Sequence, residues 1–330
     1  MASTASAFSI LTILLLSATF SESKLSTSYY AKTCPRLEQI VTEAVTTKQI
    51  SNPTTAAGAL RLFVHDCFVE GCDASVLVSS NAFNKAERDS DINLSLPGDA
   101  FDLVTRIKTS LELQCPGIVS CADVLALATR DAVKMVGGPY YKVRLGRKDS
   151  FVSKAANVEG NLPRLNMSLD QIIGMFAKKG FTVRELVALT GGHTIGFSHC
   201  REFADRIYNY SKDSAFDPAI NPKYAAGLRK HCENYTKVDG MSAFNDVITP
   251  GKFDNMYYQN LKRGLGLLSV DSVMWGDKRT RPYVETYAAD QQLFFADFAK
   301  AMEKMSVMEV KTGRKGEVRN RCDAFNELRT

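Results

Sequence analysis

One short stretch constrains the fold and chemistry of this chain more than any other: RLFVHDCFVEGCDAS, at residues 61–75. Arg61 and His65 are four residues apart, so a helix through them places both side chains on one face. A permanent cation then lies beside a group that can carry a proton near neutral pH. A surface helix with a solvated arginine and an ordinary core histidine is the other interpretation of this spacing.

The second half of the stretch is rich in oxygen atoms. Asp66, Asp73 and Ser75 are grouped around Gly71. Carboxylates, hydroxyls and backbone carbonyls are the ligands that calcium takes in proteins. The pattern therefore predicts an ion site directly beside the helix that carries His65, with a small disulfide loop as the alternative.

A second block lies far downstream. It reads ELVALTGGHTIG at residues 185–196 and places His193 after two glycines. In this order, the two blocks resemble the distal and proximal signatures of the secreted plant (class III) haem peroxidases. Landmarks between Cys34 and Cys322 fit the same family, so the resemblance covers nearly the whole chain after its leader.

The N-terminal residues predict export. Residues 7–20 are apolar and uncharged, too short for a typical membrane span, and followed by small residues. We expect a signal peptide at residues 1–23 and one haem peroxidase domain at residues 24–330. The expected protein is a secreted monomer without a membrane span, located outside the cell, in the cell wall or in the vacuole.

The chain has eight cysteines, which in an exported protein favour disulfides over free thiols. Spacing alone favours only the pair Cys67 and Cys72, and no pair has the C-x2-C spacing of a zinc site. The full pairing is implied by the family resemblance: Cys34 with Cys115, Cys67 with Cys72, Cys121 with Cys322, and Cys200 with Cys232.

Charge and sequons narrow the possible partners. The formal net charge is +5, without a run of lysine and arginine or an aromatic-basic stripe, so no nucleic-acid partner is expected. Sequons at Asn166, Asn209 and Asn234 are candidates for glycans. A fourth, at Asn93, is set aside because the family resemblance gives this residue a buried role.

Helical periodicity dominates the chain, and the expected fold is mostly α with minimal β. Strand-like alternation is best at Tyr141–Leu145, and the loops at 79–97 and 151–167 are long enough to suggest function. The resemblance implies a two-lobed haem peroxidase fold, with haem between distal and proximal helical lobes. Helices are expected after Pro35, Pro53, Gly98, Ser120, Pro222, Asp254 and Asp290, and at two capping boxes, Ser168 with Gln171 and Thr182 with Glu185.

The resemblance gives the distal residues catalytic roles. His65 is implied as the base that takes a proton from peroxide and returns it to the departing oxygen. Arg61 would stabilise the negative charge that develops as the O–O bond breaks. Asn93 would bind the second ring nitrogen of His65 and fix its tautomer.

On the proximal side, the resemblance implies His193 as the axial ligand of the haem iron. Asp271 would accept a hydrogen bond from the other ring nitrogen of His193. Pro163, within the sequence NLP, matches the family position beside the opening for reducing substrates.

The implied cofactors are one haem b and two calcium ions. The distal calcium would use oxygens of Asp66, Val69, Gly71, Asp73 and Ser75, with Glu87 behind them. The proximal calcium would use Thr194, Asp246, Thr249, Lys252 through its carbonyl, and Asp254.

The implied function is that of a secreted peroxidase that reduces hydrogen peroxide while it oxidises small phenolic donors one electron at a time. Such chemistry serves lignin and phenolic cross-linking in the cell wall and the response to oxidative stress. A catalytically silent, calcium-binding cell-wall glycoprotein with the same fold is the alternative; the presence of all the catalytic residue types argues against it. A secreted serine hydrolase would need a G-x-S-x-G elbow, which the sequence lacks.

Overall fold

The computed structural model describes residues 25–327, so the expected signal peptide at residues 1–23 lies outside the described residues. Within residues 25–327, helices account for most of the regular structure. The strands β1 (Phe197–His199) and β2 (Ser242–Phe244) pair antiparallel, with Ser198 opposite Ala243. The expected fold class, mostly α with minimal β, is confirmed.

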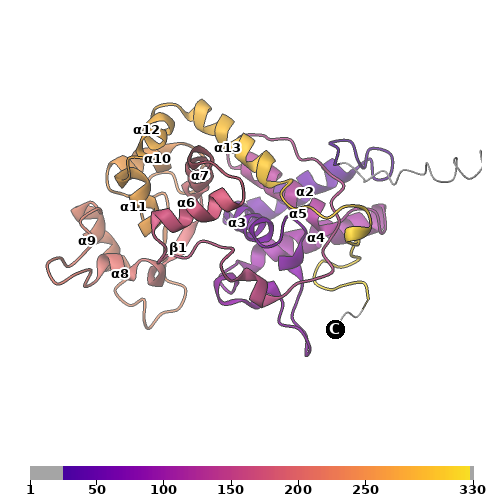
Figure 1. Cartoon of the computed structure of the whole chain (residues 1–330), viewed down its shortest axis with the longest axis horizontal. Helices are drawn as coiled ribbons and strands as arrows, with labels where there is room; N and C mark the ends of the chain where they lie inside the picture. Colours follow the sequence, from indigo (N-terminus) through magenta and orange to yellow (C-terminus); the bar gives the residue numbers. More distant parts are fainter. Residues whose placement is uncertain (1–24, 328–330) are drawn as a thin grey trace, which may run out of the picture.

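The helices form two groups, and the long helix α13 (Gln291–Met305) extends from the second group toward the first (Figure 1). The first group packs α3 against both α4 and α5, and α2 against α4 and α5. In the second group, α10, α11 and α12 pack together, and α13 packs on α7 and α12 and runs across the top of the view toward α2. The first group is α2 (Leu37–Ser51), α3 (Thr55–Phe68), α4 (Gly98–Gln114) and α5 (Cys121–Met135). The remaining helices are α6 (Leu169–Lys178), α7 (Val183–Thr190), α8 (Ala204–Ile207), α9 (Pro222–His231), α10 (Met256–Lys262), α11 (Ser269–Gly276), α12 (Arg281–Ala289) and α13 (Gln291–Met305).

Helix α3 carries Arg61 and His65 and is buried on most of its surface. Its small residues Ala56, Gly58 and Ala59 are all buried and permit close packing against α4 and α5. A Cβ added to Gly58 would lie 2.7 Å from the Pro97 ring. The predicted helix is therefore confirmed, and close packing fixes its position.

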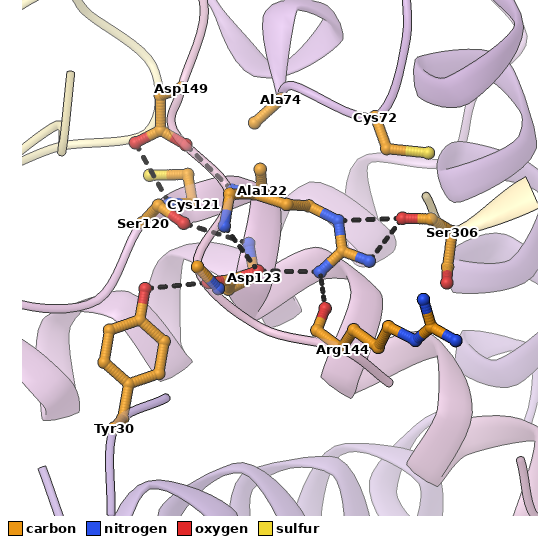
Figure 2. A network of polar contacts seen from close by, with 12 residues as sticks. Tyr30, Cys72, Ala74, Ser120, Cys121, Ala122, Asp123, Arg144, Asp149 and Ser306 are labelled. Carbon is orange, nitrogen blue, oxygen red and sulfur yellow. Dashed lines mark hydrogen bonds and ion pairs between the residues drawn. The ribbon is translucent and has the colours of Figure 1, made fainter. Parts of the chain in front are cut away.

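Helix α5 is held at its N-terminus by buried polar groups from distant parts of the chain (Figure 2). Asp123 accepts hydrogen bonds from the Tyr30 hydroxyl and from Arg147 Nη1, each at 2.7 Å, and the Arg147 and Asp123 side chains are fully buried. The backbone N–H groups of Cys121 and Ala122 donate to the Asp149 carboxylate at the positive end of the helix. Removing one partner of such a buried ion pair costs about 3–5 kcal/mol, so these contacts fix α5 and, through it, α3.

All four disulfides of the structure have the pairing that the family resemblance implies. They join Cys34 to Cys115, Cys67 to Cys72, Cys121 to Cys322, and Cys200 to Cys232. No free cysteine remains among the described residues.

Both predicted capping boxes are present, at Ser168 with Gln171 and at Thr182 with Glu185. The predicted strand at Tyr141–Leu145 is wrong. The segment is extended, but only Leu145 makes a ladder contact, with Ser26. Its apolar alternation arises because Tyr141, Val143 and Leu145 pack against the core without a neighbouring strand.

Two glycines directly before His193 would give the backbone freedom to turn at this point. The structure shows another reason for Gly191, which has an ordinary right-handed φ of −58° and continues into a 3-10 helix, Gly191–Thr194. A Cβ on Gly191 would collide with the Tyr258 hydroxyl and the Phe294 ring. The glycine is therefore required by lack of space.

Candidate functional site

The long loop at 79–97 brings Asn93 against the end of α3. Asn93 Nδ2 donates to the Glu87 carbonyl at 2.8 Å, which fixes the orientation of the amide. Its Oδ1 then lies 2.7 Å from His65 Nδ1 and accepts the proton on that nitrogen. The neutral His65 ring therefore keeps its acceptor lone pair on Nε2, where it is free to take a proton.

The surroundings of His65 keep its ring neutral. Burial, and then the nearby Arg61 guanidinium, lower the pKa of His65 to about 3, while the hydrogen bond to Asn93 opposes this shift. A buried imidazole next to a fixed cation remains a base at neutral and mildly acidic pH.

Arg61 is anchored from the same loop. Its Nη1 donates to the Ser95 carbonyl at 2.7 Å, and its Nη2 donates to the Ser95 hydroxyl at 2.8 Å. Two donors bound to one residue define both the position and the plane of the guanidinium. Sequence analysis assigned no role to Ser95, which is 34 residues away along the chain.

His193 lies in the 3-10 helix after α7, with its Nδ1 2.8 Å from Asp271 Oδ1. Asp271, in the first turn of α11, is fully buried and also accepts from the Leu268 backbone N–H and the Tyr257 hydroxyl. Burial opposes protonation of His193, but the Asp271 carboxylate outweighs it and raises the pKa of His193. The pair is thus an imidazole whose N–H is held by a buried anion.

The segment that carries His193 lies close to α3. A Cβ on Gly192 would lie 3.1 Å from Leu60, and one on Gly196 would lie 2.9 Å from Ala57. The positive charge of Arg61 opposes protonation of both His65 and His193.

Arg61 and His193 are not fully covered by the protein. The His193 side chain is 34% accessible, and Arg61 is also only partly covered. Burial is nevertheless the largest influence on the pKa of both groups. Both side chains therefore retain accessible surface in a largely buried setting.

The predicted distal ion site contains buried acceptors without a hydrogen bond. These are Asp66 Oδ1, Asp73 Oδ2 and Glu87 Oε1. Lys311 Nζ forms a 3.6 Å ion pair with Asp73 Oδ2. Burial, and then the charges of Asp66 and Asp73, raise the pKa of Glu87 to about 9. Burial raises the pKa of Asp73 to about 6, although the Ser75 hydrogen bonds and the charges of Lys311 and Arg319 oppose the shift. The Ser75 hydroxyl donates its proton to Glu87 Oε2, so the lone pairs of the Ser75 oxygen remain available to a cation. These groups fit a hard cation, which would satisfy the oxygens without a hydrogen bond.

The predicted proximal ion residues also meet in the structure. The Thr194 hydroxyl lies 3.5 Å from the Lys252 carbonyl, and the Thr249 hydroxyl donates toward both Asp246 and Asp254. Throughout residues 25–327, no three His, Cys, Asp or Glu side chains form a metal-ligand cluster by themselves. An ion at either site therefore needs the hydroxyl and carbonyl oxygens as well.

The remaining predicted positions are compatible with their expected settings. Pro163 is exposed, as a residue at a substrate opening should be. Asn166, Asn209 and Asn234 are exposed, whereas Asn93 is buried and bonded on both sides of its amide, which leaves no room for a glycan. No helix within the described part of the chain is long and apolar enough to cross a membrane.

The fold and site together define a class: a helical protein with two buried-site imidazoles, one hydrogen-bonded to an amide and the other to a buried carboxylate. Comparison with known proteins identifies this class. The peroxidase family model matches residues 38–290. The chain is 62% identical over 304 residues to Peroxidase 65 of Arabidopsis thaliana, covering 92% of this chain and 90% of that protein. It is 61% identical over 304 residues to Peroxidase 41 and 59% identical over 317 residues to Peroxidase 6 of the same plant, with at least 92% of each chain covered.

The chain therefore belongs to the peroxidase family, among the class III peroxidases of plants. It is an oxidoreductase with a plant peroxidase function, and the family uses haem iron, hydrogen peroxide and a reducing substrate. The catalytically silent glycoprotein is not favoured by these comparisons.

Proposed function

We propose that this chain is a secreted monomeric peroxidase, with its catalytic domain at residues 24–330, that reduces hydrogen peroxide and oxidises small phenolic donors one electron at a time. The observation that carries the proposal is the pair of histidine hydrogen bonds: Nδ1 of His65 is bound to Asn93 and Nδ1 of His193 to Asp271, which leaves Nε2 available in both rings. These residues, with Arg61, fit a haem b group. When bound, haem iron supplies the redox chemistry that cleaves the O–O bond.

The proposed proximal residues would hold and orient the haem. His193 Nε2 would be the ligand, because Nδ1 is committed to Asp271. The buried carboxylate pulls on the Nδ1 proton and makes the imidazole a stronger electron donor. Asp271 is itself fixed by the Leu268 N–H at 2.8 Å, so the ring orientation is set by the start of α11.

The proposed distal residues move the proton and stabilise charge. His65 Nε2 takes the proton from peroxide and delivers it to the departing oxygen. Asn93 keeps the other nitrogen protonated throughout, so only Nε2 exchanges protons. Arg61 stabilises the developing negative charge; losing one such contact costs about 3 kcal/mol in the barrier, or roughly a hundredfold in rate.

Two calcium ions are proposed to stabilise the two sides of the site. The distal residues are connected to His65 through a chain of contacts: Ser75 to the Glu87 carboxylate, and the Glu87 carbonyl through Asn93 to the ring. An ion bound there would hold the base in place. On the proximal side, Thr194 directly follows His193, so an ion bound there would brace the axial ligand. The proposed ligands are Asp66, Val69, Gly71, Asp73 and Ser75, and Thr194, Asp246, Thr249, Lys252 and Asp254.

The proposal is tested by purifying the exported protein with haem and calcium. We expect a Soret band and peroxide-dependent oxidation of guaiacol, and loss of turnover with retained haem in a His65→Leu variant. Comparing coniferyl alcohol, sinapyl alcohol and ferulate then identifies the preferred phenol, and a Pro163→Ala variant tests the proposed opening through the KM for that phenol. A protein that binds haem and calcium but does not turn over would support the silent glycoprotein instead.

A further inference from the structure

The carboxylate oxygen of Asp271 that binds His193 has a second hydrogen-bond donor, the Tyr257 hydroxyl. The Tyr257 hydroxyl donates to Asp271 Oδ1 at 2.9 Å, and His193 Nδ1 lies 2.8 Å from the same atom. Tyr257 and Asp271 are both buried. The two rings also meet edge to face, with centroids 6.0 Å apart. Tyr257 therefore shares one oxygen with the proposed haem ligand, without contacting substrate.

The hydrogen bonds of Asp271 divide the negative charge of its carboxylate. Oδ1 accepts from both His193 Nδ1 and the Tyr257 hydroxyl, and Oδ2 accepts from the Leu268 N–H. A carboxylate has no proton to donate, so the Tyr257 phenol is the donor in its 2.9 Å contact with Oδ1.

We propose that Tyr257 is a positioning residue that limits how strongly Asp271 pulls on the Nδ1 proton of His193. A carboxylate oxygen that accepts two hydrogen bonds is a weaker acceptor for each than one that accepts a single bond. With the phenol present, the imidazole keeps more neutral character and donates less charge to the iron. The inference rests on the proposed role of His193 as haem ligand.

The chain offers a matched control at the next position. Tyr258 is also fully buried, and its ring packs against that of Tyr257 with centroids 5.0 Å apart. Its hydroxyl, however, donates to the Val187 carbonyl at 2.8 Å and has no contact with Asp271. Removing either hydroxyl costs one buried hydrogen bond, but only one of the two changes frees Asp271.

The test compares haem-loaded wild type, Tyr257→Phe and Tyr258→Phe. The two readouts are the Fe–His stretching frequency of the ferrous form, by resonance Raman spectroscopy, and the midpoint potential of the Fe(III)/Fe(II) couple. Tyr257→Phe should raise the frequency and lower the potential, because Asp271 then pulls harder on His193. Tyr258→Phe should leave both at their wild-type values. Replacing Tyr257 by a fluorinated tyrosine, a stronger donor of nearly the same size, should shift both readouts in the opposite direction.

The outcomes separate this inference from the proposed function. If the wild type shows no Fe–His band, His193 is not the ligand and the proposed function fails. If the wild type shows the band, but Tyr257→Phe and the fluorinated variant do not shift it, the competition for Asp271 is refuted. Equal shifts in Tyr257→Phe and Tyr258→Phe would also refute it, since they would reflect loosened packing.

Discussion

Ser95 anchors the guanidinium of Arg61 in two ways, and only one of them depends on its side chain. The Ser95→Ala change removes the hydroxyl acceptor for Nη2, which then has only the Ile92 carbonyl at 3.4 Å, and leaves the backbone acceptor for Nη1. A hydrogen bond to a charged group contributes on the order of 1.5 kcal/mol, so the reaction with peroxide should slow by roughly tenfold. Stopped-flow measurement of the bimolecular rate constant with hydrogen peroxide checks this.

A Ser95→Thr variant is the control for this prediction. Threonine retains the hydroxyl, so its rate constant should stay close to that of the wild type. The KM for the phenol should not change in either variant, because Ser95 acts through Arg61. A wild-type rate in Ser95→Ala would mean that the Ser95 carbonyl alone is sufficient to hold Arg61.

The protonation of His65 predicts the acid limit of the peroxide reaction. Burial and the Arg61 charge lower its pKa to about 3, so the neutral base persists at neutral and mildly acidic pH. Because only the protonated His65 ring is inactive, the rate constant should stay constant from neutral pH down to about pH 4. It should decrease at lower pH, where the ring becomes protonated. A pH profile of the bimolecular rate constant measures this directly.

Asn93→Ala tests whether the hydrogen bond supports the base. The contact with Asn93 favours the protonated ring, so its loss should move the acid limit to still lower pH and reduce the plateau. An acid limit near pH 6.5 in the wild type would show that His65 titrates as an exposed histidine, which would contradict the buried geometry.

At the scale of structural elements, the loop after α3 joins the proposed distal calcium site to His65, the proposed catalytic base. The carboxylate oxygens without a hydrogen bond and the contacts from Ser75 through Glu87 to Asn93 predict a double effect of calcium removal. Chelation should lower the melting temperature, because buried like charges then repel one another, and it should also slow the peroxide reaction. Differential scanning calorimetry and stopped-flow kinetics measure the two effects.

Added calcium should restore both properties, whereas magnesium, which prefers a smaller octahedral site, should not. Asp73→Asn should reproduce the chelated state, and Asp239→Asn, at a fully exposed carboxylate, should behave as wild type. If the chelated protein melts at a lower temperature but reacts with peroxide at an unchanged rate, the ion stabilises the fold without positioning His65.

The sequence predicted the long helices better than the short elements. Helices such as α3 and α13 were predictable because their apolar spacing repeats over several turns. The strands β1 and β2 have three residues each, too few for a period to show, and their pairing joins distant segments. The short helix α11 was also missed as an element, although the resemblance implied Asp271 within it as the partner of His193, and the two side chains lie 2.8 Å apart.

The residues of the candidate site likewise fall into those that the sequence indicated and those that only the tertiary structure shows. The two signature blocks contain His65 and His193, so local spacing was informative there. Ser95 and Tyr257 act only through contacts with residues 34 and 14 positions away. Serine and tyrosine are common, and neither stands in a motif that indicates its partner. Such roles depend on tertiary packing, which residue spacing does not encode.

For the whole molecule, the disulfides differ most in the length of chain that they close. Cys121 and Cys322 are 201 residues apart, whereas Cys200 and Cys232 are 32 residues apart. Chain entropy predicts stabilisation of roughly 5 kcal/mol for the long loop and roughly 4 kcal/mol for the short one. Replacing each pair by alanines should therefore lower the free energy of unfolding more for the Cys121 and Cys322 pair, measured by urea denaturation with calcium present.

Packing in the folded state strengthens this prediction. The Cys121–Cys322 bond lies where Asp149 binds both the start of α5 and the Arg319 backbone N–H, and where the Arg319 side chain donates to the Ala74 carbonyl. Cutting it frees the C-terminal segment from the helix that positions α3. Cys200 and Cys232 lie instead in a separate small hydrophobic cluster around Phe203 and Leu228. A larger loss on cutting the Cys200–Cys232 bond would show that this cluster depends on its own disulfide, and that local packing outweighs the entropy of the long loop.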